Sequence, residues 1–144
     1  MEATLYQVDK IDSIALAPLL FKVLEQGKKV LIYCENSDLI RELDNSLWSY
    51  GRNKFLPHIT IFDKDFDLKR QPIILSNEQK NFNEADYLII LDVVEDDFLK
   101  QFSRVFCFTL NGNINKNNHL KQSFEKNSFT IKSYKKDGVK WISA

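Results

Sequence analysis

Glycine is scarce in this sequence. Only four of the 144 residues are glycine, and they are widely scattered: Gly27, Gly51, Gly112 and Gly138. Loops that cradle nucleotide phosphates need closely spaced glycines, because the backbone has to approach the phosphates. Neither the GxGxxG pattern nor the GxxxxGKS/T pattern occurs. We therefore expect no nucleotide cofactor and no dinucleotide enzyme.

Cysteine and histidine are equally rare, with two of each. Cys34 and Cys107 lie inside apolar runs, which predicts buried free thiols in a reducing cytoplasm and no disulfide framework. Cys34 also precedes an expected helix, so an activated thiolate is the alternative for that residue. His58 and His119 are far apart and have no Cys or His near them in the sequence, so we expect no zinc site and no other metal.

Neither sign of charge predominates, because 20 Lys and Arg balance 20 Asp and Glu. A neutral chain has no overall field that draws it onto nucleic acid or an anionic membrane. The N-terminus has no signal-peptide pattern, and no apolar run approaches the ~18 residues of a membrane span. These absences predict a cytoplasmic protein without a membrane partner.

The charges that are present are unevenly distributed. Residues 84–97 contain six acids and no Lys or Arg, whereas residues 111–144 contain seven lysines and only two acids. Segregation of this kind within one chain indicates two faces for two different partners.

Hydrophobic periodicity predicts alternating strands and helices. Continuous apolar runs over 30–34 and 87–91 are typical of central strands that are covered on both faces. Further strands are expected at 4–8, 59–62, 72–75, 105–110, 129–135 and 139–142. Helices are expected at 12–26, 37–50, 97–102 and 116–126.

The order strand, helix, strand, helix is typical of βαβ units and a parallel sheet. Asp12 or Ser13 is the expected cap of the first helix, and Ser37 is the expected cap of the second. Near the end of the chain, Asp137-Gly138 predicts a tight hairpin, which adds an antiparallel strand. We predict an α/β fold: a single three-layer Rossmann-like domain over residues 1–144, with a mostly parallel central sheet and an antiparallel edge.

Four acids follow the expected strand at 87–91, and two explanations are open for them. Asp92 and Glu95 could hold a metal ion, which makes a Rossmann-like nucleotide- or metal-dependent hydrolase one hypothesis. Asp96 and Asp97 could instead cap the short helix that follows and stabilise its positive end. We favour the caps, because no phosphate-binding loop accompanies the carboxylates.

The expected second helix carries more aromatic surface than one buried face accommodates. Leu39, Leu43 and Leu47 recur at i, i+4 and i+8 and predict its inward stripe. Trp48 lies about 100° round from that stripe, on a flank of the helix. A large aromatic side chain in this position indicates a surface that a partner covers.

The loop after this helix adds apolar surface beside Trp48. Pro57 restricts Leu56 to extended conformations, which stiffens the Phe55-Leu56 pair. His58 is expected to order the loop through a hydrogen bond or to lie at the rim of an interface. A partner-binding hot spot and a second small core under the loop are both compatible with this pattern.

The basic C-terminal third interleaves lysines with aromatic residues, namely Phe124, Phe129, Tyr134 and Trp141. Such a pattern can support direct binding of single-stranded DNA. Solvated lysines with aromatics packed underneath are the ordinary alternative, and the neutral charge of the whole chain weakens direct DNA binding. No direct nucleic-acid contact is therefore expected, whereas an acidic peptide would suit this surface.

Taken in order, the motifs of the chain resemble those of the chi subunit family of bacterial DNA polymerase III. The likeness runs from Thr4 to Trp141. The segments that carry it are Gly27–Glu35, Leu43-Asp44 with Leu47-Trp48, Phe55-Leu56-Pro57-His58, Gln71-Pro72-Ile73, Ala85–Ile90 and Gly138–Trp141.

The resemblance implies a non-catalytic adaptor in the clamp-loader assembly of the replicative polymerase. The psi subunit or a related helicase-type partner is implied to bind Trp48, Phe55, Leu56, Pro57 and His58. The C-terminal tail of the single-stranded DNA-binding protein is implied to bind a second, basic surface, made by Lys121, Phe124, Lys126, Ile131 and Lys132.

The chain departs from the family in its last helix. The resemblance leads us to expect a cluster of arginine or lysine there, and this chain has Lys121 and Lys126, no arginine, and Glu125 between them. Lysine offers a point charge where arginine offers a bidentate fork, which implies weaker binding of the tail carboxylates.

Overall fold

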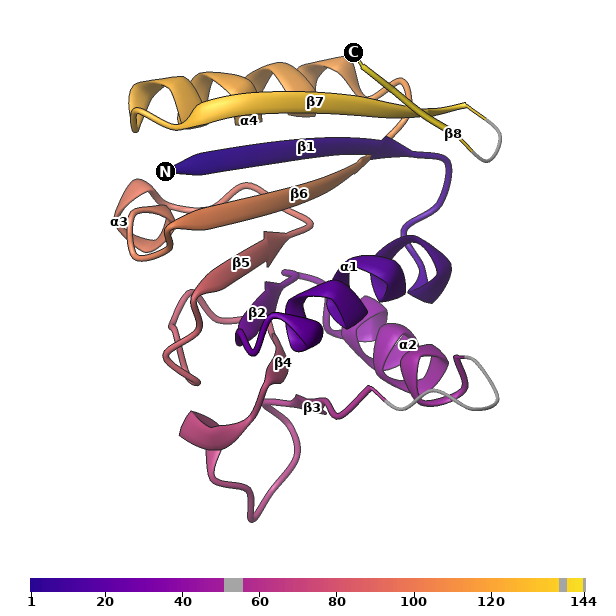
Figure 1. The fold of residues 1–144 in the computed structure, drawn as a ribbon, viewed down its shortest axis with the longest axis vertical. Coiled ribbons are helices and arrows are strands. Elements are labelled where there is room, and N and C mark those ends of the chain that lie inside the picture. The colour runs from indigo at the N-terminus through magenta and orange to yellow at the C-terminus, as the bar shows by residue number, and fades with distance from the viewer. Residues whose placement is uncertain (51–55, 138–139, 144) are drawn as a thin grey trace.

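The computed structural model describes residues 1–50, 56–137 and 140–143. These residues form one sheet with the strand order β3-β4-β2-β5-β6-β1-β7-β8 (Figure 1). Neighbouring strands are parallel except for the last pair, in which β8 is antiparallel to β7. The strands are β1 (Glu2–Val8), β2 (Val30–Tyr33), β3 (Ile59–Thr60), β4 (Ile73–Ser76), β5 (Tyr87–Ile90), β6 (Arg104–Leu110), β7 (Thr130–Asp137) and β8 (Lys140–Ser143).

Helices cover both faces of this sheet. They are α1 (Ser13–Glu25), α2 (Ser37–Trp48), α3 (Asp96–Leu99) and α4 (Ile114–Lys126), with a short 3-10 helix at Leu68–Arg70. Alternate side chains of β2 enter different cores: Ile32 packs with α1 and α2, and Tyr33 packs with α3 and α4. The predicted three-layer α/β fold with an antiparallel edge is confirmed. No helix in the described ranges is long and apolar enough to cross a membrane.

The start of each long N-terminal helix is set by a side chain that caps it. The Asp12 carboxylate accepts a hydrogen bond from the backbone N–H of Ala15 at 3.0 Å, and Gly27, with φ +68°, follows the end of α1. The cap of α2 is Asn36, whose side chain accepts from two backbone N–H groups, so the prediction of Ser37 was wrong by one residue. The Asp137-Gly138 turn, by contrast, lies partly outside the described residues.

The predicted caps of the short helix were also wrong, although Asp96 and Asp97 do lie in its first turn, at its positive end. The N-cap position of α3 is Glu95, which makes no capping hydrogen bond with its side chain. The Asp96 carboxylate contacts Lys126 Nζ at 2.9 Å and accepts a hydrogen bond from Asn127 at 3.0 Å. These contacts lower the pKa of Asp96, and they link α3 to the C-terminal end of α4.

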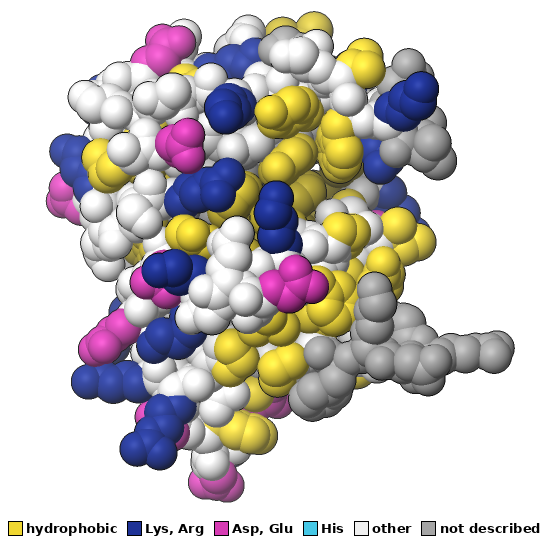
Figure 2. All heavy atoms as spheres, viewed as in Figure 1, with side chains coloured by type: hydrophobic (Ala, Val, Ile, Leu, Met, Phe, Trp, Pro, Cys, Tyr) yellow, Lys and Arg dark blue, Asp and Glu magenta, His cyan; other side chains and the backbone are white. Residues whose placement is uncertain are grey.

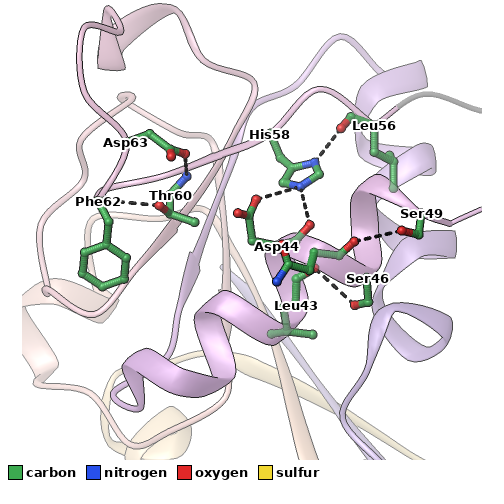
Figure 3. A network of polar contacts seen from close by, with 10 residues as sticks. Leu43, Asp44, Ser46, Ser49, Leu56, His58, Thr60, Phe62 and Asp63 are labelled. Atoms are coloured by element: carbon green, nitrogen blue, oxygen red, sulfur yellow. Dashed lines mark hydrogen bonds and ion pairs between the residues drawn. The ribbon is translucent and has the colours of Figure 1, made fainter.

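Strand β3 ends earlier than the sequence predicts. The Asp63 carboxylate accepts a hydrogen bond from the backbone N–H of Thr60 at 2.8 Å, and the Thr60 hydroxyl accepts one from that of Phe62 (Figure 3). Because these contacts close a turn on the strand itself, the chain turns away after Ile61, whose backbone N–H still donates to the backbone oxygen of Leu75 at 3.0 Å.

Both cysteines are buried, as predicted. Burial raises the pKa of the Cys34 thiol to about 11, and its Sγ lies 3.6 Å from the backbone oxygen of Asn36. Burial raises the pKa of Cys107 as well. A raised thiol pKa keeps the inert protonated form at neutral pH, so the alternative of an activated Cys34 thiolate is not supported.

We therefore predict that a disulfide reagent such as DTNB labels neither thiol of the folded protein at a free-thiol rate at pH 8. Both thiols should react at once in guanidinium. The folded state prefers the neutral thiol, so the contribution of Cys34 to stability is complete below the unfolded pKa of ~8.5 and is lost as the pH rises through about 11. A thiol of the folded protein that titrates near pH 7 would contradict this assignment.

Candidate functional site

The C-terminal end of α2 presents a tryptophan at the surface. The inward residues of α2 are Ile40, Leu43 and Leu47, whereas Leu39 is only partly buried at the edge of the stripe. Trp48 follows on the flank of the helix and is 50% exposed. The predicted partial exposure of Trp48 is confirmed.

A buried histidine lies directly against this tryptophan. The rings of His58 and Trp48 are 4.2 Å apart between centroids. Nδ1 of His58 lies 2.6 Å from the backbone oxygen of Leu56, and Nε2 lies 3.1 Å from both the backbone oxygen and Oδ1 of Asp44 (Figure 3). All three oxygens are hydrogen-bond acceptors within reach of the ring nitrogens. His58 therefore ties the loop to α2, as predicted.

Asp44 is the third member of this cluster. Burial raises the pKa of its carboxyl, while the charge of His58 and hydrogen bonds from the Trp48 and His58 side chains act in the opposite direction. The carboxyl thus contacts both rings and fixes them relative to α2. An aromatic side chain held in this way loses little rotamer freedom when a partner covers it.

The predicted cluster around Trp48 divides into surface and core. Leu56 is only 2% exposed and packs in the core beside α2, and His58 is buried as well, so the alternative of a small core under the loop holds for these two residues. Pro57 is half-buried. Phe55 lies outside the described residues.

Sequence reasoning missed Arg41, on the same flank of α2 as Trp48, and Phe62, which follows β3 and lies against Arg41. Arg41 precedes Trp48 by seven residues, which is close to two helical turns. Its guanidinium lies 4.8 Å from the ring centroid of Phe62, which is partly exposed. The i, i+7 spacing was the available signal for Arg41. We call Arg41, Trp48, Pro57 and Phe62 the Trp48 surface.

The residues predicted to hold the tail of the single-stranded DNA-binding protein do not gather at one place. Lys121 and Lys126 are five residues apart, which puts them about 140° apart round α4. Lys126 already contacts Asp96. Phe124 has an exposed fraction of 0%, so it belongs to the core and cannot line a pocket for the tail.

Strand alternation separates the remaining two residues of that prediction. Ile131 packs against the core on the α4 side of the sheet. Lys132 is in register with Thr4, two residues before the Tyr134 and Tyr6 pair, whose rings stack on the α1 side. Because side chains two residues apart share a face, Lys132 lies on the opposite face from Lys121. The register of β7 could not be derived from spacing alone.

Asp92, one of the two carboxylates considered for a metal site, makes contacts that stabilise the fold. Oδ2 of Asp92 accepts a hydrogen bond from the backbone N–H of Glu35 at 2.9 Å, and Oδ1 lies 3.2 Å from Lys116 Nζ. Lys116 also donates to the backbone oxygen of Leu91 at 2.7 Å. The backbone N–H of Glu95 donates to Gln79 Oε1 at 2.8 Å. Within the described ranges no three His, Cys, Asp or Glu side chains form a group that could hold a metal ion.

Comparison with known proteins gives a consistent family. The sequence model described as "DNA polymerase III chi subunit, HolC" matches residues 1–128. The DNA polymerase III subunit chi of Pseudomonas aeruginosa is 32% identical over 84 residues, which cover 58% of this chain and 56% of that protein. The subunit chi of Haemophilus influenzae is 32% identical over 87 residues, which cover 60% and 59%. The chain thus aligns with somewhat more than half the length of these relatives.

A solved structure with a related fold is the Sulfolobus solfataricus SWI2/SNF2 ATPase C-terminal domain. The TM-score is 0.51 at 17% identity, over 81% of this chain and 57% of that domain. At this identity the similarity concerns the α/β fold alone. The family model, by contrast, matches the sequence itself over most of its length. This match shows that the chain belongs to the DNA polymerase III chi subunit family.

Proposed function

We propose that the chain is a non-catalytic adaptor of the DNA polymerase III holoenzyme in the bacterial cytoplasm. It links the clamp loader, through the psi subunit or a related helicase-type partner, to the C-terminal tail of the single-stranded DNA-binding protein. The observation that carries the proposal is the state of Trp48. Its side chain is half exposed, and its ring packs against the ring of the buried His58.

The Trp48 surface has the features of a protein interface. Tryptophan and arginine are the residue types that most often dominate binding energy, and both occur here on one helix flank. The ring of Trp48 is held by His58 and Asp44, so its position is set before a partner arrives. Phe62 extends the apolar surface next to Arg41. A psi-type subunit would cover this surface with apolar side chains of its own.

The tail site of the proposal centres on Lys121. Two other lysines of α4 are engaged in ion pairs, Lys116 with Asp92 and Lys126 with Asp96. Lys121 makes no ion pair in the described part of the chain. Ile114, 67% exposed, lies seven residues before it and therefore on the same side of α4. A charged group next to an exposed apolar side chain suits an acidic tail with an apolar tip.

We predict that Trp48→Ala weakens binding of the psi-type partner without unfolding the chain. Removing a central aromatic anchor costs on the order of 2 kcal/mol or more, which is roughly a 30-fold rise in Kd. Calorimetric titration measures the affinity, and thermal unfolding checks the fold. Trp141→Ala is the matched control, because Trp141 lies on β8, and it should bind as wild type. Unchanged affinity of Trp48→Ala would remove this surface from the proposal.

We also predict that Lys121→Glu weakens binding of a peptide with the sequence of the tail. The attraction is between charges at an exposed surface, so wild-type binding should weaken as salt is raised above about 0.1 M, where the screening length is roughly 10 Å. Lys132→Glu makes the same charge change on the other face of the sheet and should have no effect, and neither variant should alter the Trp48 partner's affinity. A peptide that binds wild type and Lys121→Glu equally at low salt places the tail elsewhere.

A further inference from the structure

A groove of about 430 Å³ lies between α1 and the sheet, away from both surfaces proposed above. Its floor is formed by side chains of β1, β6 and β8, chiefly Tyr6, Phe108 and Trp141, and one wall by Pro18 and Leu19 of α1. Figure 2 shows this face of the molecule, with hydrophobic side chains gathered across it and Lys and Arg side chains beside them.

The groove exists because this side of the sheet is only partly covered. Figure 1 shows α1 and α2 at the β2–β4 half, and no helix in the described ranges lies in front of β1 and β7. On the other side, α4 packs along β7 and buries Leu120 and Phe124. Parallel strands are normally covered by helices on both faces. The uncovered strands instead show a row of aromatic rings, with Tyr6 between Phe108 and Tyr134.

The rim of the groove is basic. Lys10, Lys22, Arg104 and Lys136 line it. Two acids also line it, so four cations face two anions; Asp12 caps α1, and Asp9 accepts a hydrogen bond from Asn111 at 2.6 Å. Arg104 forms an ion pair with Glu2, with 3.7 Å between Nε and Oε2, and its buried Nε has no hydrogen-bond partner among the described residues. These groups favour an occupant that carries carboxylates.

Nucleobases fit this floor poorly. The faces of the Tyr6 ring are turned to its neighbours, with centroids 5.0 Å from Phe108 and 5.8 Å from Tyr134 at interplanar angles of 25° and 21°. Lys136 Nζ lies over Trp141, 4.6 Å from the ring centroid. Stacking platforms for single strands need ring faces that are open to the bases. Apolar side chains, in contrast, can pack against the ring edges that these residues present.

Lys136 of β7 lines the groove beside Trp141 of β8, and both strands follow the segment that the family model matches, residues 1–128. We propose that the groove binds an amphipathic helix of a partner protein, which supplies the missing cover of the sheet. The apolar face of the helix packs on Tyr6 and Trp141, and acidic residues along its edge pair with Lys136, Arg104 and Lys22. This site is independent of the Trp48 surface and of Lys121.

The test is a selection of displayed helical peptides, about four turns long, against the full chain. Apolar residues are fixed at i, i+3, i+4 and i+7, and the flanking positions are random. We expect selected peptides to be rich in Asp and Glu and to shift the emission of Trp141, measured in a Trp48→Phe background. Their Kd should rise at least about tenfold for Lys136→Glu and for Lys22→Glu. Lys135→Glu, on the same strand and the opposite face, should bind as wild type.

Four results would overturn the proposal. Selection could return no peptide that depends on Lys136 and Lys22, or peptides with basic flanks. Oligothymidylate could displace the selected peptides, which would assign the groove to nucleic acid. Sedimentation could show self-association of the wild-type chain that Lys136→Glu and Trp141→Ala abolish, which would assign the groove to a second copy. Binding of the psi-type partner and of the tail peptide is measured separately and does not depend on these outcomes.

Discussion

The need to cover a parallel sheet on both faces organises this molecule. Strand β2 is buried along its whole length, because α1 and α2 pack on one face and α3 and α4 on the other. The helices on the α1 side do not extend over β1 and β7, so the aromatic floor with Tyr6 and Trp141 remains accessible. Trp48 is exposed for a related reason: α2 turns the stripe with Leu43 and Leu47 toward the sheet, and Trp48 lies about 100° round from Leu47.

Much of the fold could be predicted from the sequence. The apolar runs at 30–34 and 87–91 predicted central strands, and both are central in the sheet. Local chemistry also narrowed the cap of α1 to Asp12 or Ser13, and the cap is Asp12. The caps of α3 failed because Asp96 contacts Lys126 and Asn127 at the end of a distant helix, and local propensity carries no information on such contacts.

The candidate sites were predictable to a smaller extent. Helical geometry correctly put Trp48 on a flank, because the angle from the inward stripe follows from spacing alone. Burial of Leu56 and Phe124 could not be derived, since an apolar residue at the edge of an element fits either surface or core until the layers are known. The place of Lys132 depends on strand register, which a shift of one residue would reverse. Among the candidate site residues, the exposure of Trp48 is thus the feature that the helical spacing predicted best and on which the proposed partner site rests.

The central claim is that separate faces of one chain bind two replication partners. Hydrogen exchange of the full chain tests it directly, measured alone, with the psi-type subunit and with the tail peptide of the single-stranded DNA-binding protein. The psi-type subunit should slow exchange at the C-terminal end of α2 and in the segment from Leu56 to Phe62, and the tail peptide should slow exchange in α4. Protection of the same segment by both partners, or no change at the end of α2 with the psi-type subunit, would contradict the claim.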